Sequence, residues 1–432
     1  MRVALTGDSI VTRRGLTSDP AAARLYDLIR GCDAAFTNIE VVPSGFRGDP
    51  SFENDGSHLA AEPGVLDDLL GAGFSLFTAA NNHILDYGIA GLRLTMEEFD
   101  RRGMCHAGLG HTLETARMPA YLDVAAGSVA LLACCSTFPK GKEAGAQRPD
   151  MQGRPGLNPL RFETVHEVTP AQFAALQSIA GSLGLEAQRS EKIQLGFGFP
   201  PIDASIFHFQ GQSYRAAETP AIRTAALSRD VEGIAKWVRE ARSRADLVVL
   251  SLHAHEQGAT MEAPAEFIPP FCRRMIEAGA DIVVGHGPHL LRGVEMHRGH
   301  PIFYSLGNFV GQNELTQKLP ADSYDLFRVS QESTPGAMYA QRHDNDRKGF
   351  PADRRFWEAV VPICRFADGG LAEIEIHPIV LGFGLKPHQR GRPMLAEGAQ
   401  ARAILERFAL LSSEFGTQID IGDGIARLRI PA

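Results

Sequence analysis

The chain has no apolar run long enough to cross a membrane, and it has few cysteines. No stretch approaches the roughly 18 apolar residues that a transmembrane helix needs. The six cysteines form no Cys-x-x-Cys pair, so we expect free and mostly buried thiols. The apolar stretch that follows Met1 is too short for the core of a signal peptide. These absences predict a cytoplasmic protein without a membrane anchor.

The chain also has no excess of positive charge. Its formal net charge is -8, from 43 Lys and Arg against 51 Asp and Glu, so no basic field attracts nucleic acid or an anionic membrane. An anionic substrate must therefore be bound by local cations or by a metal. With 44% hydrophobic residues the composition is that of a globular protein, and 432 residues suffice for one large domain with insertions or for two ordinary ones.

Short apolar runs alternate with helical patterns, which indicates a layered α/β fold. We expect strands at 2–6, 34–37, 74–78 and 128–134, with helices near 20–31, 62–72 and 88–102. The alternation resumes with a helix at 230–243, a strand at 246–252, a helix near 264–278 and strands at 281–284 and 301–306. Periodicity alone does not distinguish one sheet from two.

Three regions depart from this alternation. Residues 136–225 are rich in Gly and Pro and are predicted to form an insertion, a lid that folds over the sheet edge. Residues 311–355 are polar and are predicted to be a mobile loop. Residues 370–432 are expected to hold a strand and an amphipathic helix, in which Ile404, Leu405, Phe408 and Leu411 recur at helical spacing.

Five polar clusters each follow a predicted strand. They are Gly7-Asp8, Asn38-Ile39-Glu40, Asn81-Asn82-His83, His253-Ala254-His255-Glu256 and Gly285-His286-Gly287-Pro288-His289. Carboxylate, amide and imidazole groups bind hard or borderline metals. Because the carboxyl ends of strands line the ligand crevice of an open α/β sheet, the clusters predict a dinuclear metal site.

The cluster that begins at Asn81 is one of the two most specific. Asp86 follows His83 by three residues, so both share one face if a helix begins here, and the carboxylate can orient the imidazole. The alternative, an Asn-rich turn that caps the next helix, leaves His83 and Asp86 unexplained. In the other specific cluster, a turn at Gly287-Pro288 brings His286 and His289 to one ion or to two adjacent ions.

Three arginines outside these clusters are candidates for binding an anion. They are Arg161, and Arg390 and Arg392 in the basic stretch 386–392. Either these side chains bind a substrate carboxylate or phosphate, or they belong to solvated turns.

In order and content the clusters resemble the CapA family of bacterial poly-gamma-glutamate capsule synthesis, within the calcineurin-like metallophosphatase superfamily. The resemblance is carried by Leu-Thr-Gly-Asp8, Thr-Asn38-Ile-Glu40, Asn81-Asn82-His83-Ile-Leu-Asp86-Tyr-Gly88, His253-Ala-His255-Glu256, Gly-His286-Gly-Pro-His289 and Tyr304-Ser-Leu-Gly-Asn308-Phe. It covers nearly the whole chain. It implies a four-layer αββα sandwich of two mixed sheets, with an insertion and a C-terminal extension, in which 1–432 form a single domain.

The resemblance also implies a role for each matching residue. The metal ligands are Asp8, Glu40, Asn82, His253, His286 and His289, and they hold two divalent ions (Mn, Fe or Zn). His83 is the catalytic imidazole beside the leaving group, and Asp86 orients it. Asn38, His255 and Glu256 are further ligands or support the ligands. Ile10 stands where the superfamily has a histidine, so the site holds either two metals or one, with His255 as a substitute ligand.

The hypothesis that follows is a metal-dependent hydrolase. Metal-activated water would attack a phosphoester, or an amide or ester bond, in a glutamyl-type or other anionic substrate that is a small molecule or short polymer. The alternative is a non-catalytic, metal-stabilised accessory protein of capsule-type polymer synthesis. Ile10 favours the accessory protein, whereas the pair His83 and Asp86 favours the enzyme. The oligomeric state stays open, and no nucleic-acid partner is expected.

Overall fold

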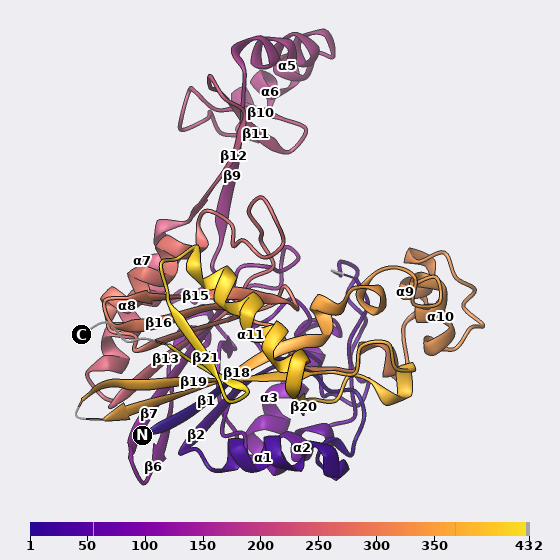
Figure 1. Ribbon diagram of the computed structural model, residues 1–432. Coiled ribbons are helices and arrows are strands. Elements are labelled where there is room, and N and C mark those ends of the chain that lie inside the picture. The colour runs from indigo at the N-terminus through magenta and orange to yellow at the C-terminus, as the bar shows by residue number, and fades with distance from the viewer. Residues whose placement is uncertain (55, 368, 429–432) are drawn as a thin grey trace.

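The core of the protein is a pair of mixed β-sheets that pack face to face (Figure 1). The computed structural model describes residues 1–54, 56–367 and 369–428. The first sheet has the order β21-β22-β19-β18-β1-β2-β3-β4, with β17 beside β1 and β20 beside β19. The second has the order β15-β16-β14-β13-β7-β6. Both sheets are mixed, because parallel central strands carry antiparallel strands at their sides.

The strands of the first sheet come from both ends of the chain. They are β1 (Arg2–Ile10), β2 (Ala34–Ile39), β3 (Leu76–Thr78), β4 (Cys105–Ala107), β17 (Asn308–Gly311), β18 (Glu358–Ala367), β19 (Gly370–Val380), β20 (Met394–Leu395), β21 (Ile419–Gly422) and β22 (Ile425–Leu428). The second sheet consists of β6 (Ala120–Val124), β7 (Gly127–Cys135), β13 (Leu247–His253), β14 (Ile282–His286), β15 (Leu291–His297) and β16 (His300–Leu306).

Helices cover the outer face of each sheet and complete four layers. The first sheet is covered by α1 (Ala23–Arg30), α2 (Val65–Ala72) and α3 (Gly88–Arg101), and the second by α7 (Ser228–Arg242) and α8 (Ile268–Ala278) (Figure 1). In β13, Leu247 and Val249 belong to the core between the sheets, whereas Val248 and Leu250 pack on the side of α7 and α8. A strand buried on both faces reads as a continuous apolar run. The predicted αββα sandwich is confirmed.

The C-terminal helix α11 (Gly398–Ser413) packs against β15 and β19. Ile404, Leu405 and Phe408 of its predicted apolar face are buried. The strand predicted within 370–432 is β19, which pairs along its whole length with β18, a strand that the sequence analysis did not predict. Residues 429–432 of the predicted C-terminal region lie outside the described residues.

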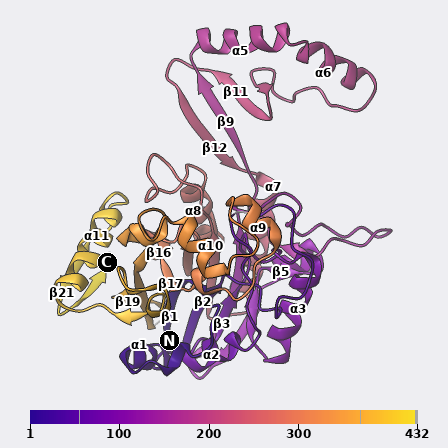
Figure 2. The same cartoon turned by 90° about the vertical axis from the view of Figure 1, so that its right-hand side faces the viewer.

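Most of the predicted insertion forms a separate arm. Its sheet has the order β10-β11-β9-β12, made of β9 (Phe162–Val168), β10 (Phe207–Phe209), β11 (Gln212–Ala216) and β12 (Ala221–Ala226), and it carries α5 (Pro170–Ser182) and α6 (Leu185–Gln194). The arm projects away from the sandwich instead of folding over the sheet edge (Figures 1 and 2). The reason is that β9 and β12 pair with each other along a two-stranded ribbon, which carries the helices beyond the body.

The stretch predicted to be a loop at 311–355 contains two helices instead. They are α9 (Ala321–Leu326) and α10 (Pro335–Arg342). Both are short and mostly polar, and their few apolar residues, including Tyr324, Met338 and Tyr339, form a small core of their own. A helix of six or eight residues with so few apolar positions gives little periodic signal.

Four of the six cysteines are buried, as the sequence analysis predicted. Within the described part of the chain, no helix is both long and apolar enough to span a membrane.

Candidate metal centre

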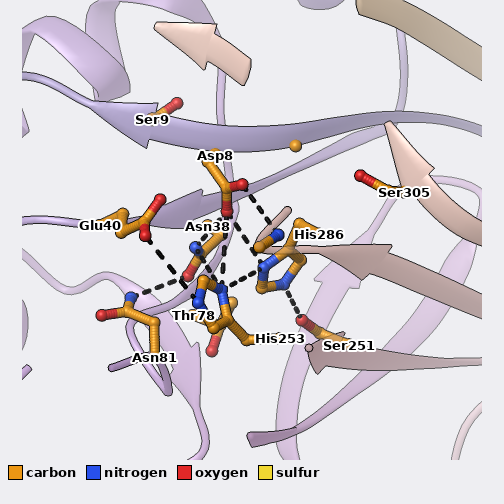
Figure 3. Close-up of polar contacts among 12 residues, drawn as sticks. Asp8, Ser9, Asn38, Glu40, Thr78, Asn81, Ser251, His253, His286 and Ser305 are labelled. Atoms are coloured by element: carbon orange, nitrogen blue, oxygen red, sulfur yellow. Dashed lines mark hydrogen bonds and ion pairs between the residues drawn. The ribbon is translucent and has the colours of Figure 1, made fainter. Parts of the chain in front are cut away.

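The polar clusters meet where parallel strands of the two sheets end. In the first sheet Asp8 of β1 lies in register with Asn38 of β2, and in the second sheet His253, the last residue of β13, lies in register with His286, the last residue of β14. Figure 3 shows these four side chains pointing toward one another between the sheets. The alternation of strand and helix therefore brings together residues that lie far apart in the sequence. The amide of Gly287 donates to Oδ2 of Asp8 across 279 positions and between the two sheets.

A first group of possible ligands joins Asp8, His253 and His286. Nδ1 of His286 lies 3.2 Å from Oδ1 of Asp8, and Nδ1 of His253 lies 3.7 Å from the same oxygen. The two Nδ1 atoms are 2.9 Å apart. All three side chains are fully or almost fully buried.

A second group joins Glu40, His253 and His255. Nε2 of His253 is 3.0 Å from Nε2 of His255 and 3.8 Å from Oε1 of Glu40. Oδ1 of Asn82 is 3.0 Å from the same nitrogen of His253. His253 thus belongs to both groups, with one ring nitrogen toward each.

A third group, Asp8, Glu40 and His289, connects the first two. Nδ1 of His289 lies 3.5 Å from Asp8 Oδ2 and 3.7 Å from Glu40 Oε2. Asn308 Oδ1 is 2.9 Å from the same nitrogen. His289 has a backbone φ of 60°, a left-handed conformation that follows the turn at Gly287-Pro288. The structure therefore places all six predicted ligands in one continuous set.

Glu40 gives a direct indication that this set is suited to a cation. Its carboxylate is completely buried, and neither oxygen has a hydrogen-bond partner among the described residues. Burial and the negative charge of Asp8 raise the pKa of Glu40 well above its usual value. A buried carboxylate without a partner is costly, and a divalent ion would supply the missing positive charge. The amide nitrogen of Asn82 is also unpaired among these residues, which fits an Asn82 that offers its oxygen to a metal.

The protonation states of the other groups fit the same role. Burial, and then the neighbouring imidazoles, lower the pKa of both His253 and His255 well below the usual value. Neutral imidazole is the form that binds a metal. Burial opposes the ionisation of Asp8, but His286 and His289 outweigh it and hold the pKa of this carboxyl well below its usual value.

Further side chains hold the candidate ligands in place. Asn38 donates through Nδ2 to Asp8 Oδ1 at 2.7 Å, and Asn81 donates in turn to Asn38 Oδ1 at 3.1 Å. Ser251 Oγ lies 2.7 Å from Nε2 of His286, the ring nitrogen that faces away from Asp8 (Figure 3). Such partners fix the orientation of metal ligands. Asn38, considered either a ligand or a support, therefore supports Asp8 in this arrangement.

Glu256 also lies outside the candidate ligand groups. Its two oxygens accept hydrogen bonds from Ser136 Oγ at 2.6 Å and Thr137 Oγ1 at 2.8 Å. Thr137 Oγ1 additionally lies 2.8 Å from the amide nitrogen of His255. Glu256 therefore fixes the segment that presents His255.

His83 and Asp86 form a close pair beside the ligands. His83 Nδ1 is 2.6 Å from Asp86 Oδ2, which leaves Nε2 as the second ring nitrogen. The sequence analysis expected the two side chains to share a helix face if a helix began here. They do not, because α3 begins only at Gly88. Residues 81–87 form turns, in which the amide of Asp86 donates to the carbonyl of His83. The local turn brings the two side chains together instead.

Lys142 is a member of this site that the sequence analysis missed. Its buried ammonium group donates to Asp86 Oδ1 at 3.1 Å and to the carbonyl oxygen of Asn82 at 2.9 Å. Burial opposes the ionisation of Asp86, but the charges of His83 and Lys142 lower the pKa of this carboxyl below its usual value. Lys142 follows β7 and shares no motif with Asp86, so sequence spacing gave no signal for the contact.

The three candidate arginines do not reach the site. Arg161 is paired through two nitrogens with buried Asp230. Arg390 is paired with both Glu314 and Asp346. Arg392 is half-buried on the side of the molecule where Tyr26 lies. The predicted role of these arginines in binding substrate is therefore not supported by their positions, because local carboxylates engage the first two.

A cavity of about 540 Å³ opens beside the candidate metal ligands. Asn82, His83, His255 and His289 form one wall. Ile10 also lines it, so the position where the superfamily has a histidine offers only an apolar side chain. His255 supplies an imidazole to the group that contains Glu40.

Residues 2–313 match the sequence profile of the family described as bacterial capsule synthesis protein PGA_cap. The chain belongs to this family. CapA proteins are part of the calcineurin-like metallophosphatase superfamily, and the family is metal-dependent.

Several relatives support this membership. Uncharacterized proteins y4sH and y4uA of Sinorhizobium fredii are each 34% identical, over 98% of this chain and 92% of their own length. PGA biosynthesis protein CapA of Bacillus subtilis is 27% identical over 57% of this chain and 44% of its own. A probable polyglutamine synthesis accessory protein of Mycobacterium tuberculosis is 26% identical over 54% of this chain and 44% of its own length. This chain thus covers less than half of the length of each of these two named relatives.

Metal removal offers a test of the role of Glu40. Adding Mn²⁺ to metal-free protein should raise the melting temperature, because a ligand that binds only the folded state stabilises it by about 2.7 kcal/mol at 100 times its Kd. Glu40→Gln should lose most of this rise, since the amide does not balance a divalent charge. Thermal unfolding of the unaltered protein and of Glu40→Gln, each with and without Mn²⁺, measures the rise and its loss.

Glu295→Gln is the matched control, because this buried glutamate pairs with Arg273 and Tyr304 and belongs to no candidate ligand group. It should keep the Mn²⁺-dependent rise. A Glu40→Gln protein with an undiminished rise would contradict the assignment of Glu40 as a ligand.

Proposed function

We propose that this chain is a metal-dependent hydrolase that cleaves a phosphoester, or an amide or ester bond, of an anionic substrate related to capsule-type polymers. The observation that carries the proposal is the position of His83 and Asp86. Their buried pair lies beside the candidate metal ligands, and His83 lines the same cavity as His255 and His289. A metal with a purely structural role does not require such a pair.

Asp8, Glu40, Asn82, His253, His255, His286 and His289 would hold one or two divalent ions. When bound in such a site, these ions lower the pKa of water and polarise the bond to be cleaved. Asp86 holds Nδ1 of His83, so that Nε2 remains to donate a proton to the leaving group. Lys142 keeps Asp86 anionic and fixes the carbonyl of Asn82.

The names of the relatives are what indicates the substrate class. A PGA biosynthesis protein and a probable polyglutamine synthesis accessory protein are among them. A glutamyl-type substrate is therefore the first candidate, and a phosphoester is the second, because the superfamily is one of metallophosphatases.

A non-catalytic accessory function is the second candidate. Ile10 favours it, because this position lacks the histidine that the superfamily uses as a ligand. The name of the Mycobacterium tuberculosis relative also describes an accessory protein.

The test is a substrate panel with protein that has been purified without chelator and supplemented with Mn²⁺. The panel contains a phosphomonoester, a phosphodiester and a γ-glutamyl anilide. We expect turnover of one bond class that disappears with chelator and returns with metal. Metal binding without turnover of any member would contradict the hydrolase and support the accessory function.

A further inference from the structure

The cavity beside the candidate metal ligands has a second wall that carries positive charge. This wall is formed by the end of α10 and the residues after it, including Arg342, Lys348 and Phe350. In Figure 2, α9 and α10 lie over the edge of the sandwich below the arm. The wall belongs to the region 311–355, which the sequence analysis expected to be a loop.

Arg342 differs from the arginines around it because no carboxylate balances its charge. Arg390 pairs with Glu314 and Asp346, and Arg347 pairs with Asp344. Arg342 has no ion-pair partner among the described residues, and its Nη1 donates a hydrogen bond to Ser57 Oγ at 2.9 Å. A guanidinium group has five N–H donors, so Arg342 retains donors for a further acceptor.

The surroundings of Arg342 hold the guanidinium in place. Its central carbon lies 4.1 Å from the centre of the Phe327 ring, and the side chain is partly buried. Burial lowers the pKa of Arg342 from its usual value, with no neighbouring carboxylate to oppose this effect. A positioned, partly desolvated arginine with open donors is suited to bind a carboxylate or phosphate in a bidentate manner.

Lys348 adds a second charge to the same wall. It is exposed, lines the cavity and has no ion-pair partner in the described ranges. Two positive side chains without counter-charges therefore line this cavity, although the chain as a whole carries a formal net charge of -8. The charge on this wall is local.

Apolar side chains line another part of this cavity. The rings of Phe350 and Phe356 pack in a tilted arrangement with centres 4.4 Å apart, and Phe350 also meets the ring of His289 edge to face at 5.3 Å. Met261 lies at the same cavity. The cavity thus combines an apolar surface with a cationic corner and a wall of candidate metal ligands.

The contact of Arg342 with Ser57 connects this corner to the candidate catalytic pair. Ser57 lies two residues before Leu59, whose amide donates to Asp86 Oδ2 at 2.9 Å. The same short segment therefore contacts the guanidinium at one end and holds the carboxylate that orients His83 at the other. An anion bound to Arg342 would be fixed relative to His83 by this segment.

We propose that Arg342, assisted by Lys348, binds an oxyanion of the substrate, a carboxylate or a phosphate other than the group that is cleaved. The apolar wall at Phe350 packs against the uncharged part of the same molecule. The proposal rests on the proposed function only in that it calls this molecule a substrate. Binding of the anion does not require turnover.

The test measures binding by calorimetry to full-length, Mn²⁺-loaded protein with two probes, glutarate and glycerol phosphate. The probe that binds more tightly identifies carboxylate or phosphate as the anion. Arg342→Gln should weaken binding of that probe at least about tenfold, since a hydrogen bond to a charged group contributes about 1.5–3 kcal/mol. Lys348→Gln should weaken it by a smaller factor, and Arg342→Lys should restore part of the loss.

Arg347→Gln is the matched control. It removes a positive charge from the same segment, but this side chain is paired with Asp344 and lies outside the cavity lining. Its affinity should equal that of the unaltered protein. Should Arg342→Gln fail to fold, Lys348→Gln carries the test, because this exposed side chain is not needed for packing.

Absence of binding by both probes would overturn the proposal. So would an affinity of folded Arg342→Gln, or of Lys348→Gln where Arg342→Gln does not fold, equal to that of Arg347→Gln and the unaltered protein. Binding that depends on Arg342 without turnover of any substrate would uphold this proposal and overturn only the hydrolase. Turnover together with probe binding that depends on neither Arg342 nor Lys348 would uphold the hydrolase and overturn this proposal.

Discussion

Replacing His253 by alanine is expected to remove metal from the whole candidate centre. This one imidazole belongs to the group with Asp8 and His286 and to the group with Glu40 and His255. Because even residues that only support a ligand cost about 10–100-fold in metal affinity, loss of this shared ligand should cost more than about 100-fold. Metal analysis of protein purified without chelator should show a stoichiometry near zero.

His208→Ala is the control for this experiment. His208 lies exposed on β10 of the arm and bonds only to Ser213 among the described residues. Its metal content should match that of the unaltered protein. If His253→Ala kept its metal while folded, the two groups of ligands would not act as described.

Replacing His83 by alanine is expected to abolish most of the turnover and leave the metal in place. His83 belongs to none of the candidate ligand groups, although it lines the cavity beside them. General acid catalysis contributes about 10²–10⁴-fold, so kcat should fall by that factor. The measurement is kcat for the substrate found in the panel, together with metal content for each preparation.

Asp86→Asn provides the matched comparison. The amide retains the size of the carboxylate but no longer matches both His83 and the ammonium of Lys142. We expect a smaller fall in kcat than for His83→Ala, again with the metal retained. Full activity of folded His83→Ala would refute its role as the acid, and loss of metal would place it among the ligands.

The sequence predicted the centre of this protein better than its periphery. Asp8, His253 and His286 could be recognised because each lies at the end of an apolar strand, and parallel strands bring such ends together. The second sheet was indicated by resemblance only, because β13 is buried on both faces and its apolar run fits one sheet as well as two.

Contacts between distant segments were not predictable from spacing. Lys142 reaches Asp86 across 56 positions, and Arg342 reaches Ser57 across 285. For the same reason the sequence did not indicate the carboxylate partners of Arg161 and Arg390, which lie 69 and 76 positions away. A basic residue in a loop gives no indication of whether a carboxylate will meet it.

The number of metal ions depends on whether another candidate ligand replaces the histidine that is missing at Ile10. In this chain His255 lies 3.0 Å from His253 and belongs to the group of Glu40, whereas Ile10 contributes only apolar surface to the cavity. His255 therefore offers the extra imidazole from the opposite sheet. This arrangement favours two ions over one.

The most direct test of the metal centre is anomalous X-ray diffraction from crystals of the protein grown with Mn²⁺. We predict one anomalous peak among Asp8, His253 and His286 and a second beside Glu40 and His255, about 3.5–4 Å apart. Well-ordered side chains at these positions without any anomalous peak between them would contradict the account.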